Sequence, residues 1–147
     1  MNIQTSKTTD EARIRTLIDQ RVKALHAKDA QAVLSCLAAD FIAFSLAPPL
    51  ISTMTEAKAY EAWFSIWQGP IGTEIRDLVI DVSGDLGVSH SLNLMTGTSS
   101  GGHDVKLWYR QTLSFRKIDG EWKIAHEHAS VPFYMDGSFR AAIDLKP

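Results

Sequence analysis

The chain has 147 residues, of which 45% are hydrophobic and 22% charged, and this composition is typical of a soluble protein with a packed core. With 15 Lys and Arg against 17 Asp and Glu, its formal net charge is −2, and no basic run suited to nucleic acid is present. The longest apolar run, at residues 41–46, is far shorter than the roughly 20 residues of a membrane span. We therefore expect one domain over residues 1–147 that binds neither nucleic acid nor a membrane.

The N-terminal sequence and the cysteine content indicate the compartment. MNIQTSKTTDEARIRT lacks the apolar segment of a secretory signal, which predicts a cytoplasmic location. Cys36 is the only cysteine in the sequence, so an internal disulfide and a cysteine-rich metal site are excluded. Because Cys36 falls on the apolar face of a predicted helix, we interpret it as a packing residue rather than a nucleophile.

The first predicted helix carries a cation inside its apolar face. Thr9 or Asp10 can cap this helix. Apolar residues then recur at helical spacing: Ile14, Leu17, Ile18, Val22 and Leu25. At 100° per residue, Arg21 lies about 20° from Ile14, in the middle of this stripe. Its guanidinium either reaches past the edge of the stripe to solvent or points into a cavity, where it needs a polar partner.

Two more helices and a strand are predicted before residue 70. Asp29 is well placed to cap a short second helix, and residues 41–46 indicate a strand that ends at Pro48-Pro49. Thr53 and Glu56 have capping-box spacing, which predicts a third helix that ends at Gly69-Pro70. This helix carries four large aromatic residues: Tyr60, Trp63, Phe64 and Trp67. They fit core packing or, for Trp63 and Trp67, the wall of an apolar ligand site.

From Thr73 onward the sequence alternates between apolar and polar residues, which predicts strands. Four strands are expected, over residues 74–82, 86–98, 105–118 and 121–131, with turn residues between them. Residues 133–147 are expected to form an edge segment or a loop. Helices followed by long antiparallel strands predict an α+β domain, in which the helices cover one face of a curved sheet.

The last two predicted strands form a hairpin, WYRQTLSFRKIDGEWKIAHEHASVP at residues 108–132, and its register depends on the turn at Asp119-Gly120. A two-residue loop pairs Ile118 with Glu121. A three-residue loop with a bulge at Gly120 pairs Lys117 with Glu121 instead. The second register sets Arg110 opposite His128, Thr112 opposite His126 and Trp108 opposite Ser130.

We favour the three-residue loop because it sorts the side chains by character. One face then collects Trp108, Arg110, Thr112, Trp122, Ile124, His126, His128 and Ser130. The other face collects Tyr109, Leu113, Phe115, Ala125, Ala129 and Val131. The first face is aromatic and polar, which predicts the floor of a pocket. The second face is mostly apolar, which predicts a homodimer through the back of the sheet.

The order of predicted elements resembles the nuclear transport factor 2-like superfamily, which includes ketosteroid isomerases and SnoaL-like polyketide cyclases. The hairpin sequence is similar to that of SnoaL-like, ketosteroid isomerase-related proteins. Its ending HEHAS is similar to a strand in the association domain of calcium/calmodulin-dependent protein kinase, a non-enzymatic member that assembles into rings. The resemblance implies a cone-shaped fold (cystatin-like roll), with three N-terminal helices covering the concave face of a curved antiparallel sheet. It does not choose between enzyme and assembly module.

The same resemblance argues against isomerase chemistry of the usual kind. When QRVKALHAKDAQAVLSCLAAD is matched to the first two helices of ketosteroid isomerases, the oxyanion-hole tyrosine falls on Arg21. The general-base aspartate falls on Ser45, so neither role is preserved. Arg21 instead suits a pocket for an anionic or carbonyl-bearing ligand.

Three interpretations of His126 and His128 stay open. Both imidazoles can belong to a hydrogen-bonded core or interface, or they can line a ligand pocket with Arg110 and Arg21. They can also bind a metal, although this needs a third ligand such as His90, and we expect none. The pocket hypothesis makes His126, His128 and Arg110 catalytic. It makes the following residues ligand-binding: Arg21, Phe44, Trp63, Trp67, Trp108, Thr112 and Ser130.

The expected function follows from this pocket. We predict an isomerase, cyclase or dehydratase that needs no cofactor and acts on an apolar molecule with a carbonyl or carboxylate group. The alternative is a module that only binds a ligand or dimerises. A hydrolase triad is not expected, because Glu127 points away from the face of Ser130 and the histidines.

Overall fold

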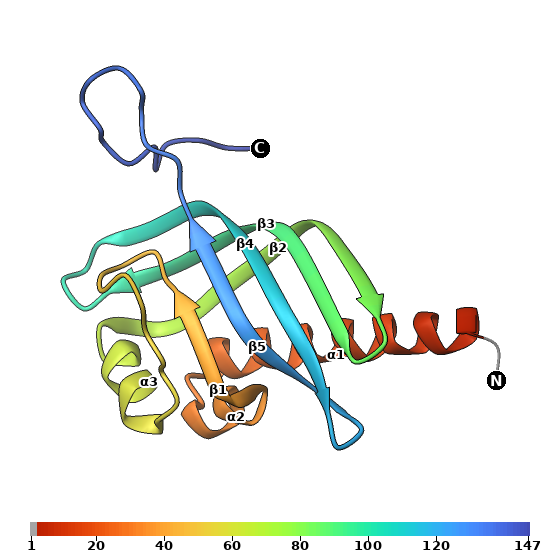
Figure 1. The fold of residues 1–147 in the computed structure, drawn as a ribbon. Coiled ribbons are helices and arrows are strands. Elements are labelled where there is room, and N and C mark those ends of the chain that lie inside the picture. Colours follow the sequence, from red (N-terminus) through yellow and green to blue (C-terminus); the bar gives the residue numbers. More distant parts are fainter. Residues whose placement is uncertain (1–2) are drawn as a thin grey trace.

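The structure has helices where the sequence shows helical periodicity and strands where apolar and polar residues alternate. A computed structural model describes residues 3–147, and within them three helices and five strands occur (Figure 1). They are α1 (Ile3–Ala27), α2 (Ala30–Ser35), β1 (Leu37–Phe44), α3 (Ala57–Phe64), β2 (Trp67–Ser83), β3 (Leu86–Ser99), β4 (Asp104–Ile118) and β5 (Glu121–Ser130). The predicted α+β fold is confirmed. None of the helices in this range is both long and apolar enough to cross a membrane.

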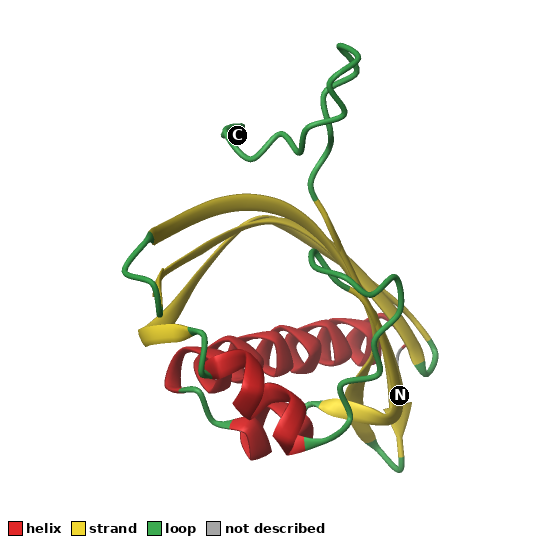
Figure 2. Ribbon diagram, turned by 90° about the vertical axis from the view of Figure 1, so that its left-hand side faces the viewer, coloured by secondary structure: helices red, strands yellow, loops and turns green. Residues whose placement is uncertain are grey.

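The five strands form one curved sheet in the order β1-β5-β4-β3-β2. The four long strands pair antiparallel as predicted, and the short strand β1 lies parallel to β5 at the edge of the sheet. Figure 2 shows the sheet arching over the helices, which lie on its concave side. We call this concave side the inner face and the opposite, convex side the outer face.

The core fills the space between α1 and the inner face. The apolar stripe of α1 is buried as predicted, with Ile14, Leu17 and Ile18 at most 7% exposed. The sheet contributes Phe115 and Ile124, which are at most 1% exposed. Burial of these side chains supplies the main stabilisation of the fold and fixes the position of α1 below the sheet.

The start of α1 differs from the prediction. The helix begins at Ile3, so Asp10 lies inside it and does not cap it. Asp10 is only 5% exposed and accepts hydrogen bonds from Trp122 Nε1 at 2.9 Å and from Lys117 Nζ at 3.0 Å. The predicted cap is wrong because the helix begins seven residues earlier, and the Asp10 carboxylate instead binds Lys117 and Trp122 beside the turn of the β4–β5 hairpin.

The boundaries of the other helices are partly as predicted. Asp29 caps α2, since its side chain accepts a hydrogen bond from the backbone N–H of Ala32 at 3.0 Å. The capping box at Thr53 and Glu56 is wrong, because Glu56 is itself the N-cap residue and its side chain makes no capping bond. Trp67 lies in β2, not in α3, because it joins the sheet opposite Ser99.

The turn between β4 and β5 has two residues instead of the predicted three. Asp119 and Gly120 have φ angles of +51° and +83°, and Ile118 pairs with Glu121. Two successive residues with positive φ match the twist of the flanking strands. The predicted pairing of Lys117 with Glu121 is therefore wrong.

A β-bulge then shifts the register of the hairpin. Phe115 pairs with Ile124, whereas Ser114 pairs with His126, so Ala125 is the extra residue in β5. The sequence holds no glycine at this point that would mark the bulge. The bulge reverses the alternation of β5. Residues 126–130 therefore point to the opposite face from the one they would have in a regular strand continued from residues 121–124.

The pairs beyond the bulge also differ from the prediction. Arg110 pairs with Ser130, and Thr112 pairs with His128. The predicted partners were displaced by two residues, which keeps these side chains on one face of the sheet but changes their neighbours. The predicted opposition of Arg110 to His128 is wrong.

The two faces of the hairpin have the opposite roles to those predicted. The inner face, which packs against α1, carries Tyr109, Leu113, Phe115, Trp122, Ile124 and Ala129, together with Gln111 and Glu127. The outer face carries Trp108, Arg110, Thr112, His126, His128 and Ser130. Leu113 and Phe115 are 2% and 1% exposed. Burying this apolar face against α1 stabilises the fold more than burying the polar face would. The prediction that groups Trp122 and Ile124 with the histidines is wrong because of the bulge.

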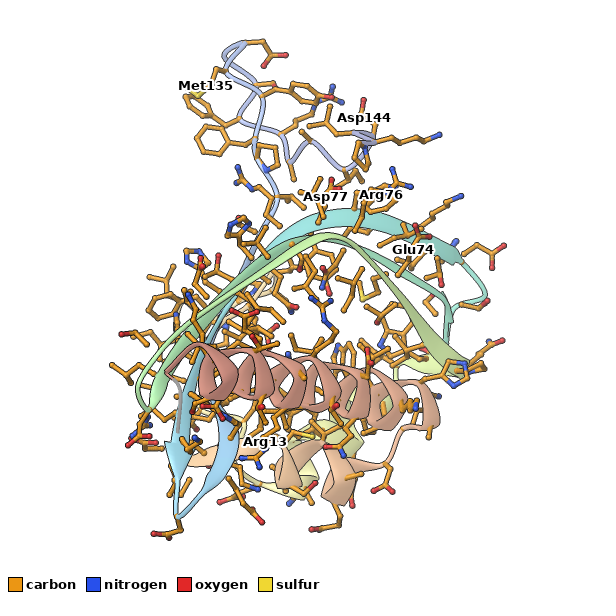
Figure 3. All side chains as sticks on the ribbon, turned by 90° about the vertical axis from the view of Figure 1, so that its right-hand side faces the viewer. Arg13, Glu74, Arg76, Asp77, Met135 and Asp144 are labelled. Atoms are coloured by element: carbon orange, nitrogen blue, oxygen red, sulfur yellow. The ribbon has the colours of Figure 1, made fainter. Side chains whose placement is uncertain are left out.

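Residues 131–147 form an arm that leaves the end of β5 and stands apart from the sheet (Figures 1 and 2). The arm closes on itself through a bridge between Phe133 and Ala141 and a hydrogen bond from Tyr134 to Asp144. Figure 3 shows Met135 and Asp144 on this arm, on the outer side of the sheet. The segment is thus a loop, one of the two forms predicted.

Candidate functional site

A cavity of about 450 Å³ lies between the inner face of the sheet and the helices α1 and α3. Its volume falls within the range typical of small-molecule sites. The cavity is lined by Arg21, Leu25, Phe41, Ala43, Ser45, Leu46, Ala47, Pro48, Pro49, Ser52, Met54, Tyr60, Trp63, Trp67, Ile71, Thr73, Met95, Leu107, Tyr109, Gln111, Glu127 and Ala129. Most of these side chains are apolar, so the cavity suits a largely apolar molecule.

Two tryptophans, in contact with each other, form part of the apolar wall of the cavity. The rings of Trp63 and Trp67 meet edge to face, with centroids 5.9 Å apart. Trp67 also packs on Gly97 of β3, where an added Cβ atom would lie 2.9 Å from the indole ring. Any larger residue at Gly97 would therefore displace Trp67 and change the shape of the cavity.

The loop that follows β1 closes another side of the cavity. Backbone hydrogen bonds between Ala43 and Ser52, 2.7 and 2.9 Å long, hold the two ends of this loop together. The loop residues Leu46, Pro48 and Pro49 face the cavity. The predicted strand stop at Pro48-Pro49 is therefore also part of the wall.

The polar end of the cavity is built around an ion pair between α1 and β5. Arg21 is 8% exposed, and its Nη2 donates to Oε2 of Glu127. The other carboxylate oxygen of Glu127 accepts from Gln111 Nε2 at 3.2 Å. Arg21 thus has the polar partner that its place in an apolar stripe requires, and both oxygens of Glu127 have a donor.

A chain of hydrogen bonds across the sheet orients this ion pair. Gln111 accepts from Asn93 Nδ2 at 2.9 Å through its side-chain oxygen, so its amide nitrogen faces Glu127. Asn93 in turn accepts from Ser91 Oγ at 2.7 Å and is 1% exposed. A buried chain in which each group is satisfied holds its members in fixed positions, and Glu127 is its last member.

Two buried side-chain nitrogens among the described residues have no hydrogen-bond partner. They are Nε of Arg21 and Nε1 of Trp67, and both residues line the cavity. An unsatisfied buried donor costs about 1–3 kcal/mol. These donors add to the polar character of the cavity at two separate places.

Burial and charge set the protonation of the groups near Arg21. Burial alone would lower the pKa of the Arg21 guanidinium, but the Glu127 carboxylate beside it holds this pKa above its ordinary value. Burial raises the pKa of the Tyr60 phenol, although the charge of Arg21 acts in the opposite direction. Burial also raises the pKa of Tyr109. At neutral pH the site therefore contains a cation and two neutral phenols that can donate hydrogen bonds.

The structure brings together only part of the predicted site. Arg21, Trp63 and Trp67 line the cavity, as the pocket hypothesis expects. The remaining predicted residues lie on the outer face or its edge, away from the cavity: Phe44, Trp108, Arg110, Thr112, His126, His128 and Ser130. They lie outside because the opposite, mostly apolar face of the hairpin packs against α1. Their catalytic or binding roles stay predictions.

The outer-face residues form a cluster of their own. The ring of Phe44 meets His126 and His128 edge to face, with centroids 4.7 and 5.4 Å apart. Nδ1 of His126 lies 2.8 Å from the backbone oxygen of Ile42, and Arg110 Nε donates to Ser130 Oγ at 3.1 Å. These contacts fit the first interpretation of the histidines, in which they are hydrogen-bonded parts of a surface.

Two further features complete the outer face. The guanidinium of Arg76 lies 4.8 Å from the ring centroid of Trp108, and Figure 3 shows Arg76 on the side of the sheet away from the helices. His90 pairs with Thr112 on the next strand, so one strand separates it from His128. No group of three or more His, Cys, Asp or Glu residues within residues 3–147 is arranged to hold a metal.

The sequence prediction missed most of the polar end of the cavity. Glu127, Gln111, Tyr109 and Tyr60 line it, but only Arg21 was expected there. One signal existed, because a buried arginine requires an acidic partner, and Glu127 points away from the histidine face. Whether Glu127 lies inside or outside depends on which face of the hairpin packs against α1, and the sequence prediction placed the histidine face there.

Comparison with known proteins identifies the family. A family model described as SnoaL-like domain matches residues 14–134. The search of curated proteins found no match. Among solved structures, a nuclear transport factor 2-like (NTF2-like) protein of unknown function from Pseudomonas putida KT2440 is 29% identical. Its TM-score is 0.83, and the match covers 95% of this chain and 98% of that one.

Two more distant structures share the fold. A candidate scytalone dehydratase from Novosphingobium aromaticivorans DSM 12444 has a TM-score of 0.76 at 18% identity, covering 92% of each chain. The association domain of CaMKII from C. elegans has a TM-score of 0.67 at 14% identity, covering 85% of this chain and 98% of that one. The fold thus occurs in proteins named for catalysis and for association. With residues 14–134 matched, this chain belongs to the SnoaL-like domain family, within the NTF2-like fold.

Proposed function

We propose that this protein binds a small, largely apolar molecule with a carbonyl or carboxylate group and moves a proton on it without a cofactor. The reaction would be an isomerisation, a cyclisation or a dehydration. One observation carries the proposal: the buried pair of Arg21 and Glu127 at the polar end of an otherwise apolar cavity.

The cost of this ion pair supports a functional role. The side chains of Arg21 and Glu127 are 10% and 14% exposed. Removing such charges from water costs several kcal/mol per ion, and apolar residues in their place are often equally stable or more so. Two charged groups inside an apolar cavity are thus poorly explained by stability, and they suit a site that handles a polar group of a ligand.

The proposed chemistry assigns a role to each polar side chain. Glu127 removes a proton from the carbon next to the ligand carbonyl, and the electron pair of that C–H bond enters an enolate. Arg21 and the neutral phenol of Tyr60 stabilise the negative charge on the enolate oxygen. In an isomerisation, Glu127 then returns the proton to another carbon of the ligand.

A dehydration would begin with the same proton transfer. The enolate then expels a hydroxyl from the adjacent carbon, and the phenol of Tyr109 or Tyr60 protonates this hydroxyl so that it leaves as water. Glu127 finally gives its proton to the phenolate, which restores both groups. The candidate scytalone dehydratase supports this version by likeness of fold alone.

The test is exchange of carbon-bound protons with solvent. We expect the protein to accelerate deuterium uptake at the carbons next to the carbonyl of 2-tetralone in D₂O, followed by proton NMR. Glu127→Gln should reduce this acceleration by about 10²-fold or more, because the amide cannot accept the proton. The control is Glu74→Gln, whose carboxylate lies on the outer face and is 55% exposed. Uptake that is unchanged in Glu127→Gln would contradict the proposed role of this carboxylate.

A second proposal concerns assembly, and it keeps the predicted homodimer through the back of the sheet but changes the residues. The outer face carries one transverse row across all five strands: Val79, His90, Thr112, His128 and Phe44. Its exposed apolar members, with Ile42 and Val88 of the adjacent row, are 37–43% exposed. A contiguous apolar and aromatic surface of this kind suits a second copy of the chain.

A further inference from the structure

The charge of the cavity lining is balanced. Of the 22 residues that line the cavity, Arg21 and Glu127 are the ones with charged side chains, and their charges cancel. Arg21 is positively charged at neutral pH, because the pKa of a guanidinium lies far above neutrality and the Glu127 carboxylate outweighs the opposing effect of burial on this pKa. A ligand that enters this cavity therefore meets no net charge, although it meets a strong local dipole.

Glu127 has little freedom to make room for an anion. One of its oxygens accepts from Arg21 and the other from Gln111. Gln111 is itself 8% exposed and held by Asn93 at 2.9 Å. A carboxylate ligand that approached Arg21 would lie beside this fixed carboxylate, and the two negative charges would repel each other strongly because the side chains around them are largely buried.

A neutral carbonyl does not meet this obstacle. Its oxygen can accept from the remaining N–H groups of Arg21 or from the phenols of Tyr60 and Tyr109, which burial keeps protonated at neutral pH. The ion pair then stays intact and the cavity stays neutral. The polar end of the cavity thus offers hydrogen-bond donors to a neutral ligand, and the Glu127 carboxylate already supplies the negative charge that balances Arg21.

We propose that the Arg21–Glu127 pair makes the cavity selective for neutral carbonyl ligands, and that Glu127 is the residue that excludes carboxylates. The inference rests on the proposed function in one respect, since it requires that the cavity binds a small molecule. It narrows the ligand class from carbonyl or carboxylate to carbonyl, and it assigns the selectivity to a single side chain.

The test compares ligands that share one ring system and differ in charge. Binding of 2-acetonaphthone, methyl 2-naphthoate and 2-naphthoate to the full-length protein is measured by isothermal titration calorimetry at neutral pH. We expect the ketone and the ester to bind at least about tenfold more tightly than the carboxylate. This comparison uses the wild-type protein alone, so it does not depend on the folding of a variant.

The variant Glu127→Gln should reverse this preference. It leaves the charge of Arg21 uncompensated, so 2-naphthoate should bind at least about tenfold more tightly than to the wild type, while the ketone changes little. The double variant Arg21→Met/Glu127→Gln should lose that gain, because no cation remains. Glu74→Gln, on the outer face, should behave as the wild type, and circular dichroism checks that each variant is folded.

The possible failures are distinguishable. Equal binding of ester and carboxylate to the wild type would overturn the selectivity, as would a folded Glu127→Gln protein that gains no affinity for 2-naphthoate. If none of the three molecules binds to the wild type or to any variant, the proposed function is contradicted, because it requires a ligand in the cavity. The selectivity would then be contradicted as well.

Discussion

Arg21 and Glu127 are 106 residues apart in the sequence, and the burial of each charge requires the other as its partner. The arginine lies in the apolar stripe of α1, where an unpaired cation would be costly, and the glutamate on the inner face of β5 offsets part of that cost. The need for an acidic partner follows from the sequence, because apolar residues surround position 21. The identity of that partner does not, since it depends on the face to which residue 127 points.

Asp10 shows a similar exchange of a local role for a distant one. A capping residue was expected, but the carboxylate accepts from Trp122 and Lys117 beside the turn of the β4–β5 hairpin. Burial alone would raise its pKa, but these two hydrogen bonds and the charge of Lys117 hold the pKa of Asp10 below its ordinary value. Asp10 therefore stabilises the fold in its ionised form.

This linkage predicts how stability depends on pH. Because the folded pKa of Asp10 is lowered, its contribution is complete above the ordinary aspartate pKa and is lost as the pH falls through the folded value. Asp10→Asn should reduce the free energy of unfolding by about 1–2 kcal/mol at neutral pH. The loss should shrink at a pH about two units below the ordinary aspartate pKa.

Urea unfolding at the two pH values measures this difference. Asp19→Asn, on the exposed side of α1, is the matched control and should have little effect at either pH. An equal loss for Asp10→Asn at both pH values would mean that the charge of Asp10 contributes nothing.

At the scale of elements, the sequence predicts the helices and strands well because their periods differ. The apolar stripe of α1, the cap at Asp29 and the alternation of the four long strands all correspond to observed elements. The end of α3 is less predictable, because Trp67 satisfies a helical pattern and a strand pattern equally. Pairing with β3 decides in favour of the strand.

The candidate site could not be predicted because the sequence does not show which face of the β4–β5 hairpin packs against α1. The two-residue turn at Asp119-Gly120 and the bulge at Ala125 together determine which face each side chain of β5 shares. No local signal marks the bulge, and it is stabilised by the burial of Trp122 before it and of Ala129 after it. Packing of the apolar face against α1, which is a long-range contact, therefore decides where the histidines point.

At the scale of the whole molecule, the fold separates two surfaces with different proposed roles. The inner face encloses the cavity, and the outer face presents Phe44, His126 and His128 away from the helices. The arm over residues 131–147 stands on the outer side and exposes Phe133, Met135 and Phe139 by 52%, 83% and 69%. Its exposed apolar residues and the outer face together fit contact with a second copy.

The dimer is tested by its mass in solution. We expect light scattering at micromolar concentration to give twice the chain mass for the wild type, and the chain mass for Val88→Glu, which places a charge in the outer face. Leu50→Glu is the control, because Leu50 is 93% exposed and lies in the loop after β1, outside the five strands. A wild-type monomer at this concentration would contradict the proposed dimer.

The central claim is that the ligand site is the inner cavity and not the histidine face, and the four tryptophans of the chain can report on it directly. Trp63 and Trp67 line the cavity, Trp108 lies on the outer face, and Trp122 binds Asp10 beside the turn of the β4–β5 hairpin. The measurement is a titration of isotope-labelled protein with 2-acetonaphthone, followed by the NMR signals of the indole N–H groups. We predict that the signals of Trp63 and Trp67 shift while those of Trp108 and Trp122 stay in place. A shift of Trp108 with Trp63 and Trp67 unchanged would contradict the account.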